Sequence, residues 1–469
     1  MCISDHLRHV RLTGSLAFSV LTYAVSQTMV IPALPTIRQD FGTDSSSIAW
    51  VMSGFFISSA IFTGIMGRFG DMFGQRRILL VTIGVYGLGS LGCALSPNLV
   101  VLVVSRVIMG SGAGMIPLCY SIARNSLPVR GLARAMGAIA MMIGLGAGIG
   151  MVLGGFIVDH FSWHASFVLA ATLSLLAAIL VLVYVPEVLT RSPAKIDVIG
   201  ATLLACGLGG LLFAISRGAA WGWADQRIIS LMSGGFVVLV ILVVIESHRA
   251  EPLLHIPTLR KRPIFFTNIG SLMMGSGQVA VSILIVQAAQ LPTDSGGLGA
   301  SASASGLLIV PYSIAMVAGS QISGRSANRF GGRLIFATGA AFAFVGLMGV
   351  ATAPMSLWEL SVMAGVSGLG ISMTLFAAPY LLYLYVPSSR IGEANGTNGI
   401  ARALGQSFGT QVTATVVTMG GVLQGDPSIY GFRLAFQLSA MACALAIVAS
   451  LLIPKSKLES FPVSVQHPT

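Results

Sequence analysis

The feature that most limits how this chain can fold is a series of long apolar runs that recurs along its whole length. Of the 469 residues, 55% are hydrophobic and only 9% are charged, and the mean hydropathy is +0.88. A bilayer core about 30 Å thick needs roughly 20 apolar residues per helix, and backbone groups in lipid must be bonded within a helix or a closed barrel. Unbroken apolar runs of this length exclude the barrel and predict an all-α membrane protein.

We place fourteen membrane spans on the sequence. Their approximate ranges are 12–34, 48–68, 77–96, 98–120, 135–158, 165–186, 198–216, 228–246, 264–286, 303–323, 334–353, 358–382, 394–417 and 433–453. The 394–417 run is the most polar of them, so its polar side chains predict a helix hidden inside the bundle. We count it as a span because the loop charges require an even number.

The basic residues predict the orientation in the membrane. With the N-terminus in the cytoplasm, most of the 26 Lys and Arg residues fall in cytoplasmic loops. The opposite loops then hold only Arg38, Arg217, Arg227 and Arg433. This bias follows the positive-inside rule. It predicts a multi-pass protein of the cell membrane (the inner membrane of a bacterium) with both termini cytoplasmic.

The remaining composition excludes several functions. The net charge of +11 is explained by topology and by contact with anionic lipid, so no nucleic-acid partner is expected. The five cysteines show no pairing or metal-ligand spacing, so no metal site is expected. A Walker loop, a Rossmann fingerprint and a His-Glu-x-x-His pattern are all missing from the sequence. We therefore expect no enzyme, no cofactor and a monomer in the lipid bilayer.

One segment occurs twice. Gly67-x-x-x-Asp71-x-x-Gly74-x-Arg76-Arg77 follows the second predicted span, and Gly324-x-x-x-Asn328-Arg329-x-Gly331-x-Arg333 follows the tenth. Both lie on the predicted cytoplasmic side, which is expected of two parallel halves with a substrate between them near the midplane. The predicted domains are a six-helix half over 1–190, two inserted helices over 191–250, a second six-helix half over 251–455 and a cytoplasmic tail over 456–469.

Three motifs carry a resemblance to a known family. The cassette from Gly67 to Leu80 resembles the signature loop of the major facilitator superfamily, the run from Arg106 to Gly114 resembles its second motif, and Gly150, Gly154 and Gly155 resemble its antiporter motif. As a set they resemble the fourteen-helix drug:proton antiporter family. That resemblance implies a major-facilitator-type bundle. It further implies efflux of amphipathic small molecules, such as drugs or antibiotics, by proton-coupled alternating access.

The first cassette predicts a gating motif made of Gly67, Asp71, Gly74, Arg76 and Arg77. Gly67 lets two helix ends approach closely. Asp71 can pair with the arginines and with the positive end of a neighbouring helix, which forms a latch for one gate state. The resemblance implies that these side chains bias the conformational change without touching substrate. The alternative is a tight cytoplasmic turn that only obeys the charge rule.

Two arginines lie inside predicted spans. An unpaired charge in the middle of a span costs about 2.5–3.5 kcal/mol on insertion scales, so such a residue usually faces a cavity or a partner. The resemblance implies a role for Arg106 in proton coupling or in the electrostatics of the cavity, and Arg402 is the second candidate. The alternative for Arg106 is snorkelling to the interface.

Polar stripes at helical spacing suggest the walls of the cavity. The predicted substrate-binding residues are Tyr23, Gln27, Arg106, Met109, Asn268, Gln278, Phe376, Tyr380, Asn398, Arg402 and Gln406. The methionine and aromatic side chains among them suit variable ligands. The alternatives are plain packing and polar contacts between helices worth about 0.6 kcal/mol per hydrogen bond.

The sequence departs from the family pattern in its acids. None of the 15 Asp and Glu residues lies in the middle of a span, and Gln27 stands where the family has an aspartate. Protons would then use acids nearer the rims, namely Asp159, Glu359 or Glu393. The alternative is a proton-independent facilitator or a ligand sensor of the same fold. With two buried arginines and no acid in the cavity, we expect neutral or anionic substrates.

Overall fold

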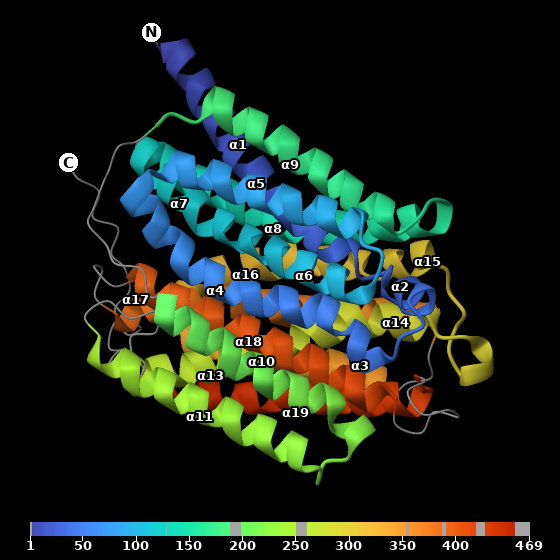
Figure 1. Ribbon diagram of the computed structural model, residues 1–469. Coiled ribbons are helices and arrows are strands. Elements are labelled where there is room, and N and C mark those ends of the chain that lie inside the picture. The colour runs from blue at the N-terminus through green and yellow to red at the C-terminus, as the bar shows by residue number, and fades with distance from the viewer. Residues whose placement is uncertain are drawn as a thin grey trace.

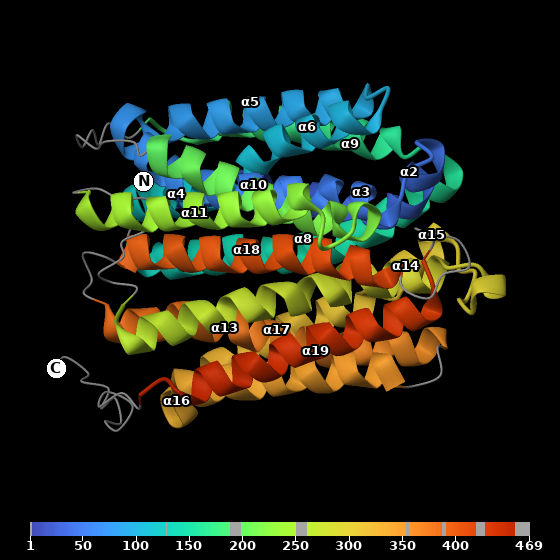
Figure 2. The ribbon, with the colours of Figure 1, turned by 60° about the horizontal axis from the view of Figure 1, so that its bottom comes forward.

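A computed structural model describes residues 2–127, 129–187, 198–249, 260–352, 356–386, 391–418 and 427–454. Within these ranges every regular element is a helix, and the long helices run side by side in one bundle (Figure 1). The first and last described residues lie at the same end of the bundle, which we call the termini end. The opposite end is the far end (Figure 2). The prediction of an all-α bundle is confirmed.

The first half of the bundle contains the helices up to residue 184. Their bounds are α1 (Cys2–Met29), α2 (Leu34–Asp40), α3 (Ser45–Ile48), α4 (Trp50–Phe73), α5 (Gln75–Ala94), α6 (Leu99–Met109), η1 (Gly110–Gly114), α7 (Met115–Ser126), α8 (Val129–His160) and α9 (His164–Tyr184). The chain bends by 56° between α1 and α2. The bend lies at the far end, in the short segment that contains Pro32. A second proline, Pro35, occupies the first turn of α2.

The second half begins after residue 260. Its helices are α13 (Arg262–Val279), η2 (Ala280–Leu284), α14 (Ile285–Gln290), η3 (Thr293–Ser295), α15 (Ala302–Leu307), α16 (Val310–Thr352), α17 (Leu357–Tyr385), α18 (Ile391–Val417) and α19 (Ile429–Leu451). Gly331 has φ +74° and ψ 159°, so α16 reverses there and supplies two spans rather than one. Its two arms pack against α17 and α19.

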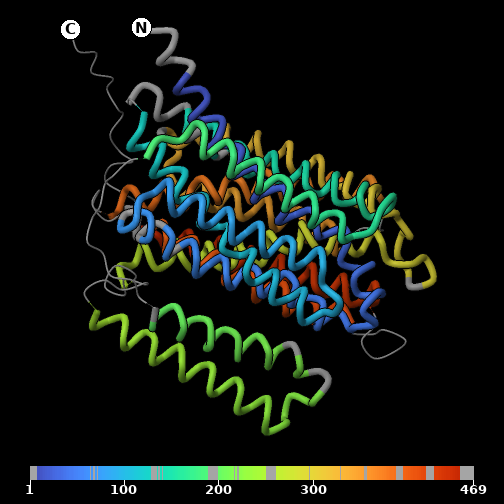
Figure 3. Tube along the Cα trace, turned by 45° about the horizontal axis from the view of Figure 1, so that its top comes forward, coloured from blue at the N-terminus to red at the C-terminus, as the bar shows by residue number. Residues whose placement is uncertain are grey.

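The helices α10 (Val198–Trp221) and α11 (Gln226–His248) form a hairpin at the side of the bundle (Figure 3). Buried Leu204 and Leu208 of α10 pack in one apolar cluster with Ala60 of α4 and Ile400 of α18. Since α4 belongs to the first half and α18 to the second, the hairpin covers one seam between the halves. The predicted boundaries near residues 190 and 250, and the 456–469 tail, lie outside the described residues.

Eleven helices in the described ranges are long and apolar enough to cross a membrane, or twelve if the bent pair α1 and α2 is one span. α10 contributes only a shorter apolar helix, Ile199–Ile215. α18 is too polar to pass the same test but lies beside α4 and α13 within the bundle. The chain is therefore a multi-pass membrane protein, and the total of fourteen spans stays a prediction.

The repeated segment forms the same turn in both halves. Gly74 (φ +97°) separates α4 from α5, and Gly331 separates the two arms of α16. Only glycine adopts such a φ at low cost. Two residues later, Arg76 Nη2 donates to Leu182 O at the end of α9 (2.7 Å), and Arg333 Nη2 donates to Leu451 O at the end of α19 (2.6 Å). In each half an arginine thus binds the negative end of the last helix.

Candidate functional site

Arg106 lies in the interior of the first half and has no exposed surface. Its Nε donates to Val51 O at 3.1 Å, and its Nη2 lies 3.3 Å from Met52 Sδ. Its guanidinium sits 4.3 Å from the centre of the Phe55 ring, which supplies a cation–π contact. Nη1 is buried without a hydrogen-bond partner in the described part of the chain. The planar guanidinium is therefore fixed against α4, with one N–H group still unused.

Tyr23 of α1 connects this arginine to the second half. Its ring stacks on Phe55, with the ring centres 6.0 Å apart and an angle of 18° between the planes. The phenol is 6% exposed and lies within electrostatic range of both Arg106 and Arg402. The two arginines and Tyr23 therefore form one central group, although they come from three helices and both halves. The sequence predicted all three as cavity residues.

Arg402 of α18 differs from Arg106 in its surroundings. Its side chain is only partly buried, and it has no hydrogen-bond partner among the described residues. The ionisable groups in its electrostatic range are Tyr23 of the first half and Tyr312 of the second, and neither is a carboxylate. A guanidinium that is not engaged by the protein keeps its N–H donors for a ligand.

Amide side chains lie on α18 on both sides of Arg402, within the second half. Asn398 Nδ2 donates to Asn268 Oδ1 (3.0 Å) and to Ser271 Oγ (2.8 Å). One helical turn beyond Arg402, Gln406 Nε2 donates to Gln278 Oε1 at 3.1 Å. These pairs join α18 to α13 on both sides of Arg402. The structure therefore brings together polar side chains that the sequence predicted on the 264–286 and 394–417 spans, and their amide groups are bonded to each other.

The other predicted cavity residues lie in separate places. Gln27 is partly buried on α1, one turn from Tyr23. Met109 is fully buried between α5 and α6, where Cys93 Sγ lies 3.5 Å from its Sδ. Phe376 and Tyr380 stack on each other with ring centres 5.9 Å apart, and Tyr380 contacts the turn at Gly332 near the termini end. The contacts given for Met109, Phe376 and Tyr380 are packing contacts away from the central group.

The predicted gating motif is described in part. Arg76 bonds to Leu182 O as above, and its Nη1 lies 3.5 Å from Glu187 Oε2. Arg77 is exposed. Gly67 and Asp71 fall within α4, but the surroundings of their side chains lie outside the described residues, as do those of Asn328 in the second copy.

The glycines of the antiporter-like motif let α8 approach two neighbours. A Cβ at Gly150 would lie 2.2 Å from Val25 O, and one at Gly154 would lie 2.1 Å from Met29 O, so these two glycines admit α1. A Cβ at Gly155 would lie 2.3 Å from Ala302 O of α15. α15 belongs to the second half. The third glycine therefore lets the two halves meet.

The hydrogen bonds that join the two halves within the described residues lie toward the far end. Ser53 and Ser407 each donate to the other's carbonyl oxygen, at 3.5 and 3.1 Å. Gln411 Nε2 donates to Ser46 O (3.0 Å), and Gln290 Nε2 donates to Pro32 O (3.2 Å). These contacts hold α4 and α3 to α18, and the segment between α1 and α2 to α14, at the end opposite the termini.

Asp159 adds a charged contact at the same end. This residue ends α8 in the first half, and its carboxylate accepts from Ala302 N (3.0 Å) and Ser303 N (2.7 Å) of the second half. These are free N–H groups at the first turn of α15. No charged side chain is among the described groups that interact with Asp159. We call Asp159 with these two N–H groups the far-end latch.

Of the other two acids predicted near the rims, Glu359 bonds to Ser356 in a capping box within its own half. The side chain of Glu393 lies outside the described residues. Ser53, Ser407 and Tyr312 were not predicted as site residues. The sequence cue for Ser407 was its position four residues before Gln411, on the same helix face. Short polar side chains are common in apolar helices, however, and the sequence does not show which neighbouring helix they face.

Two helical halves with matching turns, a hairpin between them in sequence and a polar centre define a transporter of the major-facilitator type. The family model of the Major Facilitator Superfamily matches residues 16–290, and the chain belongs to that family. The resemblance predicted from the motifs is thereby confirmed. The protein is a transporter of small molecules rather than an enzyme.

Relatives support this assignment over most of the chain. An uncharacterized MFS-type transporter of Bacillus subtilis, YcnB, is 25% identical over 95% of both chains. The tetracenomycin C resistance and export protein of Streptomyces glaucescens is 26% identical over 86% of this chain and 75% of its own. Multidrug resistance protein 3 of Bacillus subtilis is 25% identical over 86% of this chain and 78% of its own. The chain is thus related to drug and antibiotic exporters.

Solved structures share the fold. A POT family transporter in complex with 5-aminolevulinic acid superposes with a TM-score of 0.68 at 16% identity and covers 94% of this chain and 95% of its own. The human organic anion transporter MFSD10 (TETRAN) gives a TM-score of 0.61 at 15% identity and covers 94% of this chain and 99% of its own. At this level of identity the likeness concerns the fold alone.

Proposed function

We propose that this protein exports amphipathic small molecules, neutral or anionic, by alternating access between its two halves. The observation that carries the proposal is the central group of Arg106, Tyr23 and Arg402. Tyr23 lies within electrostatic range of a guanidinium group in each half, and no carboxylate of the described residues is among the groups that act on either arginine. Such a centre attracts negative or polar groups and repels cations. The relatives that confer resistance and export an antibiotic support the direction of transport.

Alternating access is supported by the way the halves meet. Among the described residues, the hydrogen bonds between the halves are concentrated at the far end, which the positive-inside rule assigns to the outside of the cell. Releasing these bonds while forming contacts at the termini end would switch access to the central group from one side of the membrane to the other. The repeated turns at Gly74 and Gly331 give each half an equivalent rigid element at the termini end.

We further propose that proton coupling acts through the far-end latch. Gln27 cannot titrate, whereas the Asp159 carboxylate joins the two halves directly. As an anion, Asp159 accepts two hydrogen bonds from the first turn of α15, and charge makes such bonds stronger. Protonation removes that charge, so acid at the far end would favour release of the latch. The protonation state of one side chain would then bias the gate.

The experiment uses proteoliposomes with an imposed pH gradient and a panel of neutral, anionic and cationic amphipathic dyes. We expect the gradient to stimulate transport of neutral and anionic dyes, and we expect Asp159→Asn to remove most of that stimulation. Asn keeps the shape and an acceptor oxygen but loses the charge. Glu359→Gln is the matched control, because that acid bonds within its own half. A dication as the preferred substrate would refute the proposed substrate class.

A second function is favoured by one observation. Gln27 occupies the position where the resemblance implies an aspartate, so the protein could be a proton-independent facilitator or a ligand sensor. Transport at the same rate with and without the gradient would establish the facilitator. Binding of the dyes without any transport would establish the sensor.

A further inference from the structure

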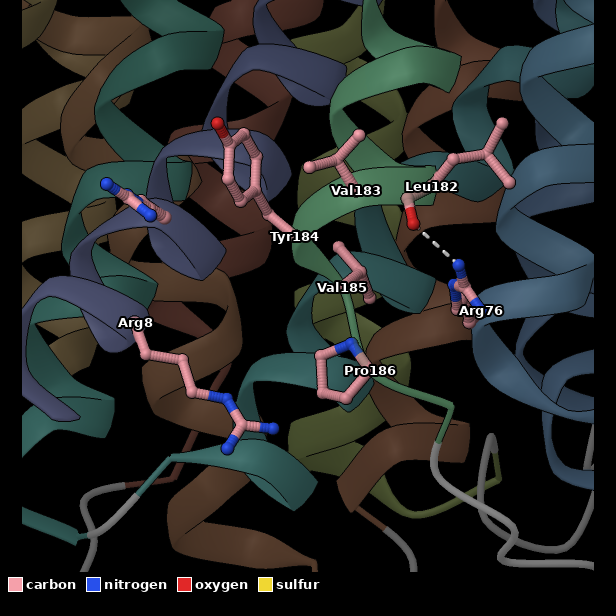
Figure 4. A pocket seen from close by; sticks show the side chains of 8 residues that line it. Arg8, Arg76, Leu182, Val183, Tyr184, Val185 and Pro186 are labelled. Carbon is pink, nitrogen blue, oxygen red and sulfur yellow. Dashed lines mark hydrogen bonds between the residues drawn. The ribbon is translucent and has the colours of Figure 1, made fainter. Parts of the chain in front are cut away.

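A pocket at the termini end lies apart from the central group. It has a volume of about 500 Å³ and is formed by α1, α5 and the end of α9 (Figure 4). Its lining combines three arginines with a short apolar segment of the chain. The lining residues are Arg8, Arg11, Arg76, Leu182, Val183, Tyr184, Val185 and Pro186. Nothing in the transport path described above uses it.

The described residues balance the charges in this pocket only in part. Arg8 is exposed, with no hydrogen-bond or ion-pair partner among the described residues, and Arg11 contacts only the Tyr184 ring, 5.7 Å from its centre. Arg76 is engaged by Leu182 O and faces Glu187 Oε2 at 3.5 Å. Of the three guanidinium groups in the lining, Arg76 alone is paired with a described carboxylate. In Figure 4, Arg8 and Arg76 lie on opposite sides of the segment from Tyr184 to Pro186.

An exposed apolar stripe leads from this pocket along α9. Leu175 (64% exposed), Ile179 (47%), Leu182 (54%) and Val183 (65%) share one helix face, because they recur at intervals of three and four residues. Leu182 and Val183 belong both to the stripe and to the pocket wall. In a membrane helix, a face with this exposure and composition contacts acyl chains. The arginines thus lie at the rim of a surface that faces lipid.

We propose that this pocket binds the headgroup of an anionic phospholipid, with its acyl chains along the stripe on α9. Basic pockets between transmembrane helices on the cytoplasmic side recognise anionic headgroups. Guanidinium groups donate paired hydrogen bonds to phosphate oxygens. The pocket supplies the positive charge, and the stripe supplies the apolar contact that a soluble phosphate cannot use. A phospholipid is therefore a better occupant than a free phosphate.

The test measures binding to the purified full-length protein in detergent by native mass spectrometry. The probes are phosphatidylglycerol, phosphatidylcholine, glycerol 3-phosphate and inorganic phosphate. We expect phosphatidylglycerol to bind at least tenfold more tightly than the other three, and the double variant Arg8→Gln with Arg11→Gln to weaken it roughly tenfold. Neither arginine donates a hydrogen bond within the described protein, so the fold should persist, which a thermal melting curve checks.

The matched control is Arg217→Gln with Arg227→Gln. These two arginines also lie over aromatic rings, Phe213 and Trp221, but in the α10 and α11 hairpin near its far end. We expect less than a twofold change in phosphatidylglycerol binding for this control. Equal weakening by both double variants, or none by Arg8→Gln with Arg11→Gln, would overturn the site. Equally tight binding of glycerol 3-phosphate or inorganic phosphate would overturn the assignment to a lipid.

Discussion

The two halves of the bundle are alike at the termini end and different at the centre. At the termini end, Arg76 and Arg333 occupy equivalent positions after equivalent glycines and bind equivalent carbonyl groups. At the centre, Arg106 is fixed by α4 and the Phe55 ring, whereas Arg402 has no hydrogen-bond partner in the described residues. The comparison indicates that the scaffold is repeated while the roles of the central arginines are divided. We therefore propose that Arg106 shapes the site and that Arg402 contacts the ligand.

The largest effect should come from Arg402→Ala. We expect transport of anionic and neutral dyes into proteoliposomes to fall at least tenfold, because the guanidinium is available to the ligand. A charge-assisted hydrogen bond is worth about 1.5–3 kcal/mol, which corresponds to roughly tenfold or more in binding. The melting temperature should change little, because no described hydrogen bond is lost. Arg124→Ala, at an exposed position, is the control. Undiminished transport would remove Arg402 from the ligand site.

A smaller effect is expected for the exchange of arginine for lysine at the two central positions. Arg106→Lys should reduce transport roughly fivefold, because lysine cannot reproduce the planar contact with Phe55 together with the bond to Val51 O. Arg402→Lys should retain most of the activity, because a point charge can still meet a mobile ligand. Transport rates of the two variants, normalised to protein in the membrane, test the division of roles. The opposite order of activities would reverse the assignment of the two arginines.

The smallest effect concerns the repeated scaffold. Arg76→Ala and Arg333→Ala should each lower the melting temperature by similar amounts, on the order of 2 °C, since each removes a hydrogen bond worth about 1–3 kcal/mol from a large protein. Gln in place of either arginine keeps a donor and should restore part of the loss. If the melting temperature falls several times more for one variant than for the other, the two arginines do not stabilise their halves equally.

Much of the fold was predictable because its signals are local. Apolar runs determine which segments cross the membrane, and the spacing from Gly67 to Arg77 identified both the family and the repeat. The central positions of Arg106 and Arg402 followed from the cost of an unpaired charge in lipid. The partners of these charges were not predictable. Phe55 and Tyr23 are ordinary aromatic residues in apolar helices. Only the packing of α4 against α6 brings Phe55 under Arg106, and only the tertiary fold brings Tyr23 of α1 onto the Phe55 ring.

The role of Asp159 shows the same limit. The sequence placed it near the rim of a span, as one of three acids that could carry protons. Its hydrogen bonds reach Ala302 and Ser303, more than a hundred residues away in the other half. No local pattern encodes that contact, because it depends on how the halves are apposed and on Gly155, which admits the backbone of α15.

The sequence by itself determined that the chain is a helical membrane transporter with two related halves. The signals for this are apolar runs, glycines and charged residues, and each of them can be recognised within a short stretch of the chain. The tertiary structure decided which arginine is held and which has no hydrogen-bond partner among the described residues, where the halves meet and where a basic pocket lies. These properties depend on distances between helices that are remote in sequence, and such distances are set by side-chain packing over the whole bundle.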